Sequence, residues 1–355
     1  MRGTGKGPAI VAGTPLIVDP LLKRLINSGP VPFRDYMNSA LYDEHSGYYS
    51  TNIREVGRTG DFSTSTTLNN SLANAIANWI QRIWNQDKDL PRSIIEIGAG
   101  NGSLAKQIIK RIGFWSRLRL DYHIVETSEP LLKLQVQRLG KRKPFQWHKD
   151  PRSALESCSG KALIISNELI DAFPVELIQW EHQKEKWRRV MVHSDNQGWT
   201  TSVGNDYEIP KKSSLLELHN FKDGQRVERH DDFVRWFHSW IGFWEQGHML
   251  SIDYGDEFPT LYERRLNGTV RAYFAQNRFE QIHEILARPG HQDITSDIDF
   301  TDIRNRLLID GLKEIKYQTQ AEFIADHEIS ASTGDPSTNP HGAGEAFKVL
   351  WHRKT

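Results

Sequence analysis

The 355-residue chain contains a single cysteine, Cys158, so it cannot form an internal disulfide bond. One thiol also makes a zinc cluster implausible, and we expect no bound metal. Lysine plus arginine equals aspartate plus glutamate, at 45 each, so no overall field attracts nucleic acid or a membrane. No apolar run approaches the roughly 18 residues of a membrane span. These absences favour a protein of a reducing compartment, with no nucleic-acid partner and no membrane insertion.

The most informative stretch is residues 94–104, Ile-Ile-Glu-Ile-Gly-Ala-Gly-Asn-Gly-Ser-Leu. Its β-branched start predicts a strand buried on both faces. Gly98, Gly100 and Gly102 then permit backbone angles and close ligand approaches that a Cβ would block. The apolar pattern resumes at helical spacing from Leu104. A strand, a glycine turn and a helix N-terminus together predict a nucleotide-type cofactor site.

The details of the turn distinguish between cofactors. A dinucleotide fingerprint places its third glycine where this chain has Ser103, which disfavours an NAD-dependent oxidoreductase. Glu96 would repel a pyrophosphate but suits the cationic amino-acid end of S-adenosylmethionine. The E-x-G-x-G-x-G pattern resembles motif I of the class I methyltransferases, although glycine turns also occur in purely structural loops. The predicted contacts to S-adenosylmethionine are therefore Glu96, Gly98, Gly100 and Gly102.

Three further acids are candidate cofactor ligands. Glu126 ends a second predicted strand, 30 residues after Glu96, where an acid can accept hydrogen bonds from ribose hydroxyls. The alternative is a helix N-terminal acid, because residues 127–130 resemble a helix start. Asp150 is a candidate for the adenine amino group or for a surface turn. Asp61 is a candidate for the methionine end of the cofactor or for fixing its own turn.

The order of predicted elements indicates an α/β fold with a Rossmann-like sheet. Strand and helix patterns alternate from residue 94 to about 175, which predicts parallel strands with helices on both faces. An antiparallel hairpin and an aromatic helical segment then interrupt this alternation. The aromatic segment, residues 233–244, fits either a core helix or the wall of a substrate cleft. We expect a flexible N-terminus (1–18), a helical extension with a lid loop (19–88), the first part of the core (89–180), an inserted hairpin and helical subdomain (181–247) and the remainder of the core (248–355).

Several segments together resemble the MidA family of S-adenosylmethionine-dependent methyltransferases. They are residues 60–65 (GDFSTS), 166–175 (SNELIDAFPV), 252–255 (IDYG), 268–273 (GTVRAY) and 292–295 (QDIT). The resemblance covers roughly residues 30 to 352, and the N-E-x-x-D-A-x-P-V segment is its most specific part. The family includes a mitochondrial complex I assembly factor that methylates a protein arginine. The resemblance therefore implies a class I methyltransferase fold, S-adenosylmethionine as cofactor and an arginine acceptor.

The chain also departs from the family pattern. Thr66 and its neighbour stand where the family commonly continues with Ser-Pro-Glu or a similar sequence. Asp297 stands where a histidine is common, and Ala272 and Gln276 lie where more polar or basic side chains are expected. We expect these differences to leave the cofactor site intact and to affect the substrate or the activity.

The acceptor side of the site is predicted at the end of the fourth strand. Asn167, Glu168 and Asp171 follow that strand and Asp253 ends the fifth, so they are expected beside the cofactor methyl group. Two carboxylates can hold the planar, charged fork of a guanidinium and orient it. The alternatives are that Asp171 caps a helix and that Glu168 pairs with a nearby cation.

The sequence thus favours a protein arginine N-methyltransferase with Asn167, Glu168 and Asp171 as catalytic residues. A small-molecule methyltransferase and a cofactor-binding assembly factor without turnover are the rivals. A bacterial cytoplasm is the expected compartment and the mitochondrial matrix is the alternative. The sequence leaves open whether the chain forms a homodimer.

Overall fold

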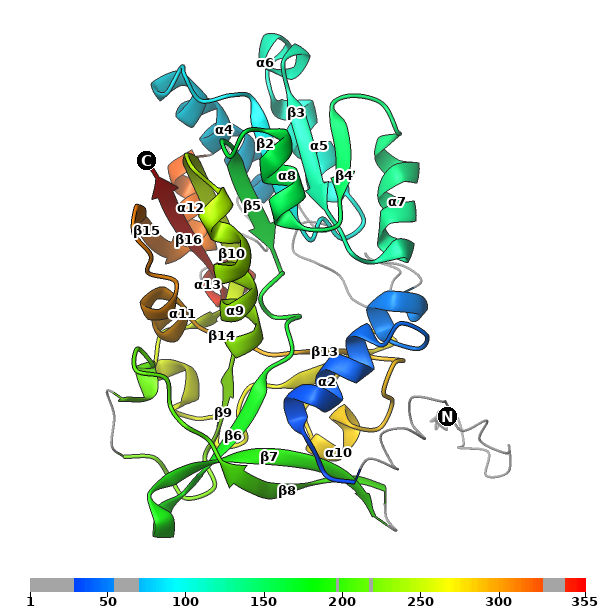
Figure 1. The fold of residues 1–355 in the computed structure, drawn as a ribbon, viewed down its shortest axis with the longest axis vertical. Helices are drawn as coiled ribbons and strands as arrows, with labels where there is room; N and C mark the ends of the chain where they lie inside the picture. Colours follow the sequence, from blue (N-terminus) through cyan, green and yellow to red (C-terminus); the bar gives the residue numbers. More distant parts are fainter. Residues whose placement is uncertain (1–28, 54–69, 196–197, 217–219, 328–341) are drawn as a thin grey trace, which may run out of the picture.

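The computed structural model describes residues 29–53, 70–195, 198–216, 220–327 and 342–355. A mixed sheet forms its centre (Figure 1), in the strand order β15 (Leu312–Thr319), β16 (Phe347–Lys354), β10 (Gly247–Asp256), β5 (Leu163–Asn167), β2 (Ser93–Ile97), β3 (Asp121–Val125) and β4 (Phe145–His148). The short strand β14 (Ile298–Asp299) extends it beside β10. The strands from β10 to β4 run parallel, whereas β16 and β15 are antiparallel to their neighbours.

Helices cover both faces of this sheet, which explains why its central strands are apolar throughout. Every residue of β2 is buried, as expected for a parallel strand between two helical layers. The core on one face includes side chains from α4 (Ser71–Gln86), α5 (Ser103–Arg111) and α12 (Gln320–His327). The core on the other face includes side chains from α8 (Pro151–Ser157), α9 (Asp231–Trp240) and α11 (Phe300–Arg306).

The strand order reverses between β2 and β5, and this reversal creates a crevice. From β2 the chain continues outward to β3 and β4, whereas from β5 it continues to β10 on the opposite side. The loops that leave the carboxyl ends of β2 and β5 therefore diverge. In open α/β sheets, ligands bind at such a point.

A second layer, below the main sheet in Figure 1, is built from segments that are far apart in sequence. One sheet has the order β1 (Val31–Pro32), β7 (Lys186–Asp195), β6 (Glu176–Glu181) and β9 (Arg226–Arg229), with β8 (Gly198–Asp206) beside β7. A smaller sheet consists of β12 (Asn277–Phe279), β11 (Arg271–Phe274) and β13 (Asp293–Thr295). Helix α2 (Phe33–Tyr42) packs with residues of both sheets in one apolar core.

The expected α/β fold is confirmed, and several strands match their predicted limits closely. Residues 145–148 and 312–319 form the strands β4 and β15 as predicted. The aromatic segment differs from the expectation that it shares an inserted unit with the hairpin. Phe237 and Trp240 of α9 are buried in the core of the main sheet, because the apolar stripe of this helix faces the sheet.

The second layer also extends beyond the expected insertion at residues 181–247. Strand β6 belongs to this layer, although it starts before residue 181. The layer also includes β1 and α2, which were expected in the N-terminal extension, and β11 to β13, which were expected in the remainder of the core. The expected flexible N-terminus and part of the expected lid loop lie outside the described residues. Within the described ranges, we find no helix with the length and apolarity needed to cross a membrane.

Candidate functional site

A cavity of about 1440 Å³ lies at the carboxyl ends of the parallel strands. Its walls come from the glycine turn, from the loop after β5 and from the second layer. The glycine-turn side includes Glu96, Gly98, Gly100, Ser103 and Glu126; the β5 and β10 side includes Asn167, Glu168, Asp171 and Tyr254; the second layer contributes Tyr42, Tyr49, Arg271, Gln276, Asp293 and Asp297. The structure thus brings most of the predicted cofactor and acceptor residues to one cavity.

The three glycines of the turn have different surroundings. All three adopt left-handed backbone angles, with φ of +72° at Gly98, +53° at Gly100 and +77° at Gly102. A Cβ on Gly100 would meet no atom of the described residues within 4 Å, because Gly100 borders the cavity. A Cβ on Gly98 would lie 3.0 Å from Leu169 Cδ1, and one on Gly102 would lie 3.1 Å from Leu139 Cδ1. Gly102 begins α5 but is not among the residues that line the cavity.

Two buried carboxylates face the cavity from neighbouring strand ends. Glu96 accepts a 2.6 Å hydrogen bond from the Tyr122 hydroxyl, and burial raises its pKa to about 7. Glu126 accepts a hydrogen bond from the Ser128 backbone N–H at 2.8 Å, and burial raises its pKa. Neither carboxylate forms an ion pair with a side chain of the described residues, so a cationic or hydroxyl-bearing ligand would stabilise both.

Gln135 holds the glycine turn in place relative to Glu126. This fully buried side chain on α7 (Glu129–Leu139) donates from Nε2 to Gly100 O at 2.8 Å and to Glu126 Oε2 at 2.9 Å. Its own Oε1 accepts a hydrogen bond from Trp147 Nε1 at 3.1 Å. Sequence reasoning missed this residue. The available signal was a glutamine on the inward face of an amphipathic helix.

The loop after β5 carries a strained glutamate. Glu168 has φ of +54°, a left-handed conformation that costs a non-glycine residue roughly 1–2 kcal/mol. The buried Asp253 carboxylate secures the turn, because its Oδ2 accepts hydrogen bonds from the backbone N–H groups of residues 169–171 at 3.2, 2.8 and 3.3 Å. The Glu168 N–H donates to Ile252 O at 2.9 Å. Such strain persists where the surroundings enforce it, most often at functional sites.

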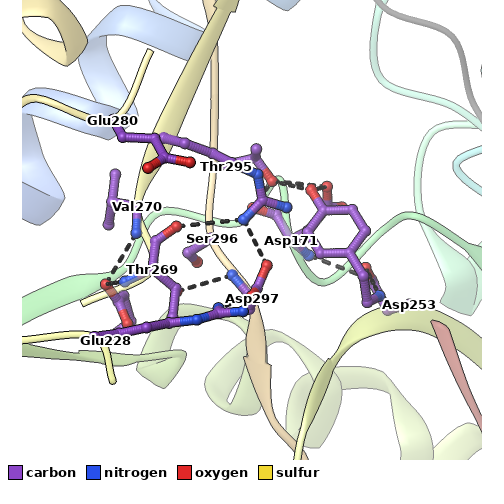
Figure 2. Close-up of polar contacts among 12 residues, drawn as sticks. Asp171, Glu228, Asp253, Thr269, Val270, Glu280, Thr295, Ser296 and Asp297 are labelled. Carbon is purple, nitrogen blue, oxygen red and sulfur yellow. Dashed lines mark hydrogen bonds and ion pairs between the residues drawn. The ribbon is translucent and has the colours of Figure 1, made fainter. Parts of the chain in front are cut away.

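Asp171 lies in a buried hydrogen-bonded cluster (Figure 2) and does not cap a helix. Its Oδ2 accepts hydrogen bonds from the hydroxyls of Tyr254 and Thr295. Its Oδ1 has no hydrogen-bond partner within the part of the chain that the structure describes. Burial raises the pKa of Asp171 despite these hydrogen bonds and the nearby charge of Arg271. Asp171 therefore presents an acceptor atom at the cavity that a bound cation could use.

The small sheet of the second layer supplies further polar groups to the cavity. Arg271 on β11 pairs in register with Thr295 on β13, and Tyr273 pairs with Asp293. The Tyr49 hydroxyl donates to Asp293 Oδ1 at 2.9 Å, and burial together with the charge of Asp171 raises the pKa of Asp293 to about 7. In the sequence, Asp293 belongs to a segment that resembles the family, and nothing around it predicts a role for this residue.

Two of the departures from the family pattern, Asp297 and Ala272, have structural explanations. Asp297 pairs with both Arg271 and Arg265, and although burial opposes it, these charges lower its pKa. Ala272 points away from these groups into the apolar core, because alternate residues of a strand face opposite sides. A basic side chain at Ala272 would be buried there without a partner. Gln276 lines the cavity.

Asp150, the third acid proposed from the sequence as a cofactor ligand, is a helix cap in the structure. Asp150 caps α8 by accepting a hydrogen bond from the Ser153 N–H at 2.9 Å, and it is not among the lining residues. This cap agrees with the surface-turn alternative, and the neighbouring residues Lys149 and Pro151 line the cavity. Asp61 and Thr66 lie outside the described residues. Across the described ranges, no group of three or more His, Cys, Asp or Glu side chains is arranged to hold a metal ion.

Comparisons with known proteins bear on the same residues. Residues 75–318 match a family described as "Putative S-adenosyl-L-methionine-dependent methyltransferase". A Danio rerio relative named Protein arginine methyltransferase NDUFAF7, mitochondrial, is 25% identical, over 94% of this chain and 86% of its own. The Drosophila melanogaster homolog is 25% identical, over 93% and 83%. A Burkholderia thailandensis protein bound to S-adenosyl-homocysteine has the same fold, with a TM-score of 0.77, 24% identity and coverage of 92% of this chain and 89% of its own.

Proposed function

Because the chain belongs to this family of S-adenosylmethionine-dependent methyltransferases, we propose that it methylates an arginine side chain of a protein. The observation that carries the proposal is that Glu168, Asp171 and Asp293 line the same cavity as the glycine turn. A guanidinium is always charged at neutral pH and presents a planar fork of donors, which suits facing carboxylates. The curated relatives are named protein arginine methyltransferases, which supports the same acceptor.

We place the cofactor along the glycine turn. The open space beside Gly100 leaves room for it, and the two buried carboxylates at the strand ends match its amino-acid and ribose parts. In this proposal Glu96 pairs with the cationic amino-acid end, and Glu126 accepts hydrogen bonds from the ribose hydroxyls. Gly98 and Gly102 shape the turn, and Gln135 holds it against Glu126.

The acceptor would occupy the other half of the cavity. The cofactor supplies an electrophilic methyl group on a good leaving group, so the protein's main tasks are proximity and alignment. Glu168 and Asp171 would hold the guanidinium fork, aided by Asn167, whose Nδ2 donates to Glu168 Oε1 at 3.1 Å. A neighbouring carboxylate would take up the proton that the methylated nitrogen releases. Asp293, with a pKa raised to about 7, is suited to this step.

The pKa of Glu96 predicts how cofactor binding depends on pH. Its raised value, about 7, means that the carboxylate is largely protonated at pH 6 and largely ionised at pH 8. The cationic end of the ligand pairs with the ionised form alone. We therefore expect the affinity for S-adenosyl-homocysteine, measured by calorimetry, to rise about tenfold from pH 6 to pH 8. A Glu96→Gln variant should bind more weakly at pH 8 and lose most of this pH dependence; an unchanged profile would remove Glu96 from the site.

The acceptor can be identified by labelling. We would incubate the purified protein and methyl-labelled S-adenosylmethionine with an extract of its own cells that lack the gene. We expect label in a discrete protein band that releases methylarginine on hydrolysis. Label in small molecules alone would favour the small-molecule alternative. Binding of S-adenosyl-homocysteine without any labelling would favour an assembly factor without turnover.

The relatives also bear on the compartment. Their names assign those proteins to mitochondria, which supports the mitochondrial alternative and gives no support to a bacterial cytoplasm. If the proposed activity is correct, the chain acts on a protein partner.

A further inference from the structure

The equal totals of acidic and basic residues conceal a strongly basic region. Residues 103–149 contain eleven lysines and arginines but only three acids, so their formal charge is 11 − 3 = +8. One of the three acids, Glu126, is buried at the cavity. The rest of the chain carries the compensating negative charge. Lys149 lines the cavity, so the basic groups that matter at the other end of the strands are those around residues 114–119 and 141–143. A local excess of positive charge attracts anionic surfaces even when the whole protein is neutral.

Within this region, the short helix α6 (Phe114–Leu118) exposes its apolar side chains. Phe114 is 57% exposed, Trp115 is 80% exposed and Leu118 is 63% exposed, and the helix buries none of its residues. Large apolar side chains so close together on the surface mark an interaction site more often than chance. Figure 1 shows α6 at one end of the molecule, on the side of the main sheet opposite the second layer.

Basic side chains surround this helix. The Arg117 guanidinium lies 5.9 Å from the centre of the Phe114 ring. Arg119 lies near Arg92, whose pKa is lowered first by burial and then by the charge of Arg119. An ion pair of 3.9 Å between Lys143 and Asp121, the first residue of β3, brings a second basic group to the same end. That group comprises Lys141, Arg142 and Lys143, all of them exposed.

We infer that this end of the protein, comprising α6 and the basic residues around it, docks peripherally on a bilayer that contains anionic lipids. Trp115, Phe114 and Leu118 would enter the headgroup layer, and the surrounding lysines and arginines would pair with lipid phosphates. In this arrangement, none of the described helices crosses the bilayer. The equal totals of acidic and basic residues led us to expect no attraction to a membrane. The uneven distribution of these charges refines that expectation.

The shape and composition of the surface favour a membrane over other anionic partners. An aliphatic side chain such as Leu118 gains nothing from stacking on nucleic-acid bases, whereas it is stabilised among acyl chains. The helix protrudes from the end of the molecule, as insertion into a headgroup layer requires. A second copy of the chain would bring an equally basic surface against this one, which is unfavourable. The cavity lies at the opposite ends of the strands and stays accessible during docking.

The test uses the full chain and sedimentation with large vesicles. One set contains phosphatidylcholine alone, and the other contains roughly one part phosphatidylserine to three parts phosphatidylcholine. We expect binding to the anionic vesicles only, with weaker binding as the salt concentration rises. Trp115→Ser and Lys141→Glu should each reduce the fraction bound, Trp115→Ser by about tenfold.

Matched controls separate docking from general effects of the substitutions. Leu308→Ser removes an apolar side chain that is 54% exposed elsewhere, and Lys222→Glu makes the same charge change in the second layer. Both controls should bind vesicles like the unaltered protein. The inference is overturned if the protein fails to bind anionic vesicles, if the controls lose binding equally, or if Trp115→Ser changes only oligomeric state or oligonucleotide binding. None of these readouts depends on methyl transfer.

Discussion

Replacing Gly100 with valine should lower the affinity for S-adenosyl-homocysteine by at least about 100-fold, or roughly 2.7 kcal/mol. The added side chain would project into space that is open in the structure and that borders the cavity. A β-branched residue also disfavours φ of +53°, so the turn would shift away from its present position. The Gly100 carbonyl, which accepts a hydrogen bond from Gln135, would move with it. Calorimetric titration measures the loss directly.

Backbone strain alone could weaken binding by destabilising the protein, and Gly224 provides the control. Gly224 has φ of +78°, and a Cβ there would also meet no atom of the described residues within 4 Å. It lies in the turn before β9 and does not line the cavity. Gly224→Val should therefore lower the melting temperature to a similar extent while leaving the affinity within about twofold of the unaltered protein. Equal losses of affinity in both variants would mean that the glycine turn is not the cofactor site.

The glycine-turn side of the cavity was predictable because its signals are local in sequence. Three independent signals lie within a few residues of one another in the sequence. The isoleucines of β2 predict a buried strand, the three glycines predict a turn, and Glu96 restricts the type of cofactor. A parallel strand followed by a glycine turn has few ways to fold, so the position of the site follows from the order of elements. The left-handed angle at Gly100 is the angle that this pattern requires.

The side of the cavity formed by the β5 loop and the second layer was less predictable because its geometry depends on contacts between distant segments. Asp253 accepts a hydrogen bond from the Ile170 N–H, 83 residues earlier in the chain. The Thr295 hydroxyl donates to Asp171, from which it is separated by 124 residues. Nothing near Asp293 in the sequence indicates that Tyr49, 244 residues away, donates to it. At position 272 the family pattern leads one to expect a more polar or basic side chain. The strand register shows that Ala272 faces the apolar core. Side chains on one strand are assigned to a face only when the partner strand is known.

Changing Glu168 to glutamine should lower kcat by about 10²- to 10³-fold, the range for losing one charged group aimed at the reacting centre. The substitution keeps the size of the side chain but removes the charge that would hold a guanidinium beside the cofactor. The affinity for S-adenosyl-homocysteine should change less than about threefold, because Glu168 lies on the β5 side of the cavity. The assay is methyl transfer to the labelled acceptor, with binding measured in parallel.

Glu185 offers a matched control for the same chemical change. It is also a glutamate in the left-handed region, with φ of +49°, but it is exposed in the turn between β6 and β7 and does not line the cavity. Glu185→Gln should leave kcat, KM and cofactor affinity unchanged. If Glu168→Gln retains full turnover, the strained conformation at Glu168 serves only the fold. The proposal of an arginine acceptor then loses its main structural support. If it loses turnover and cofactor affinity together, Glu168 contributes to the cofactor half of the cavity instead.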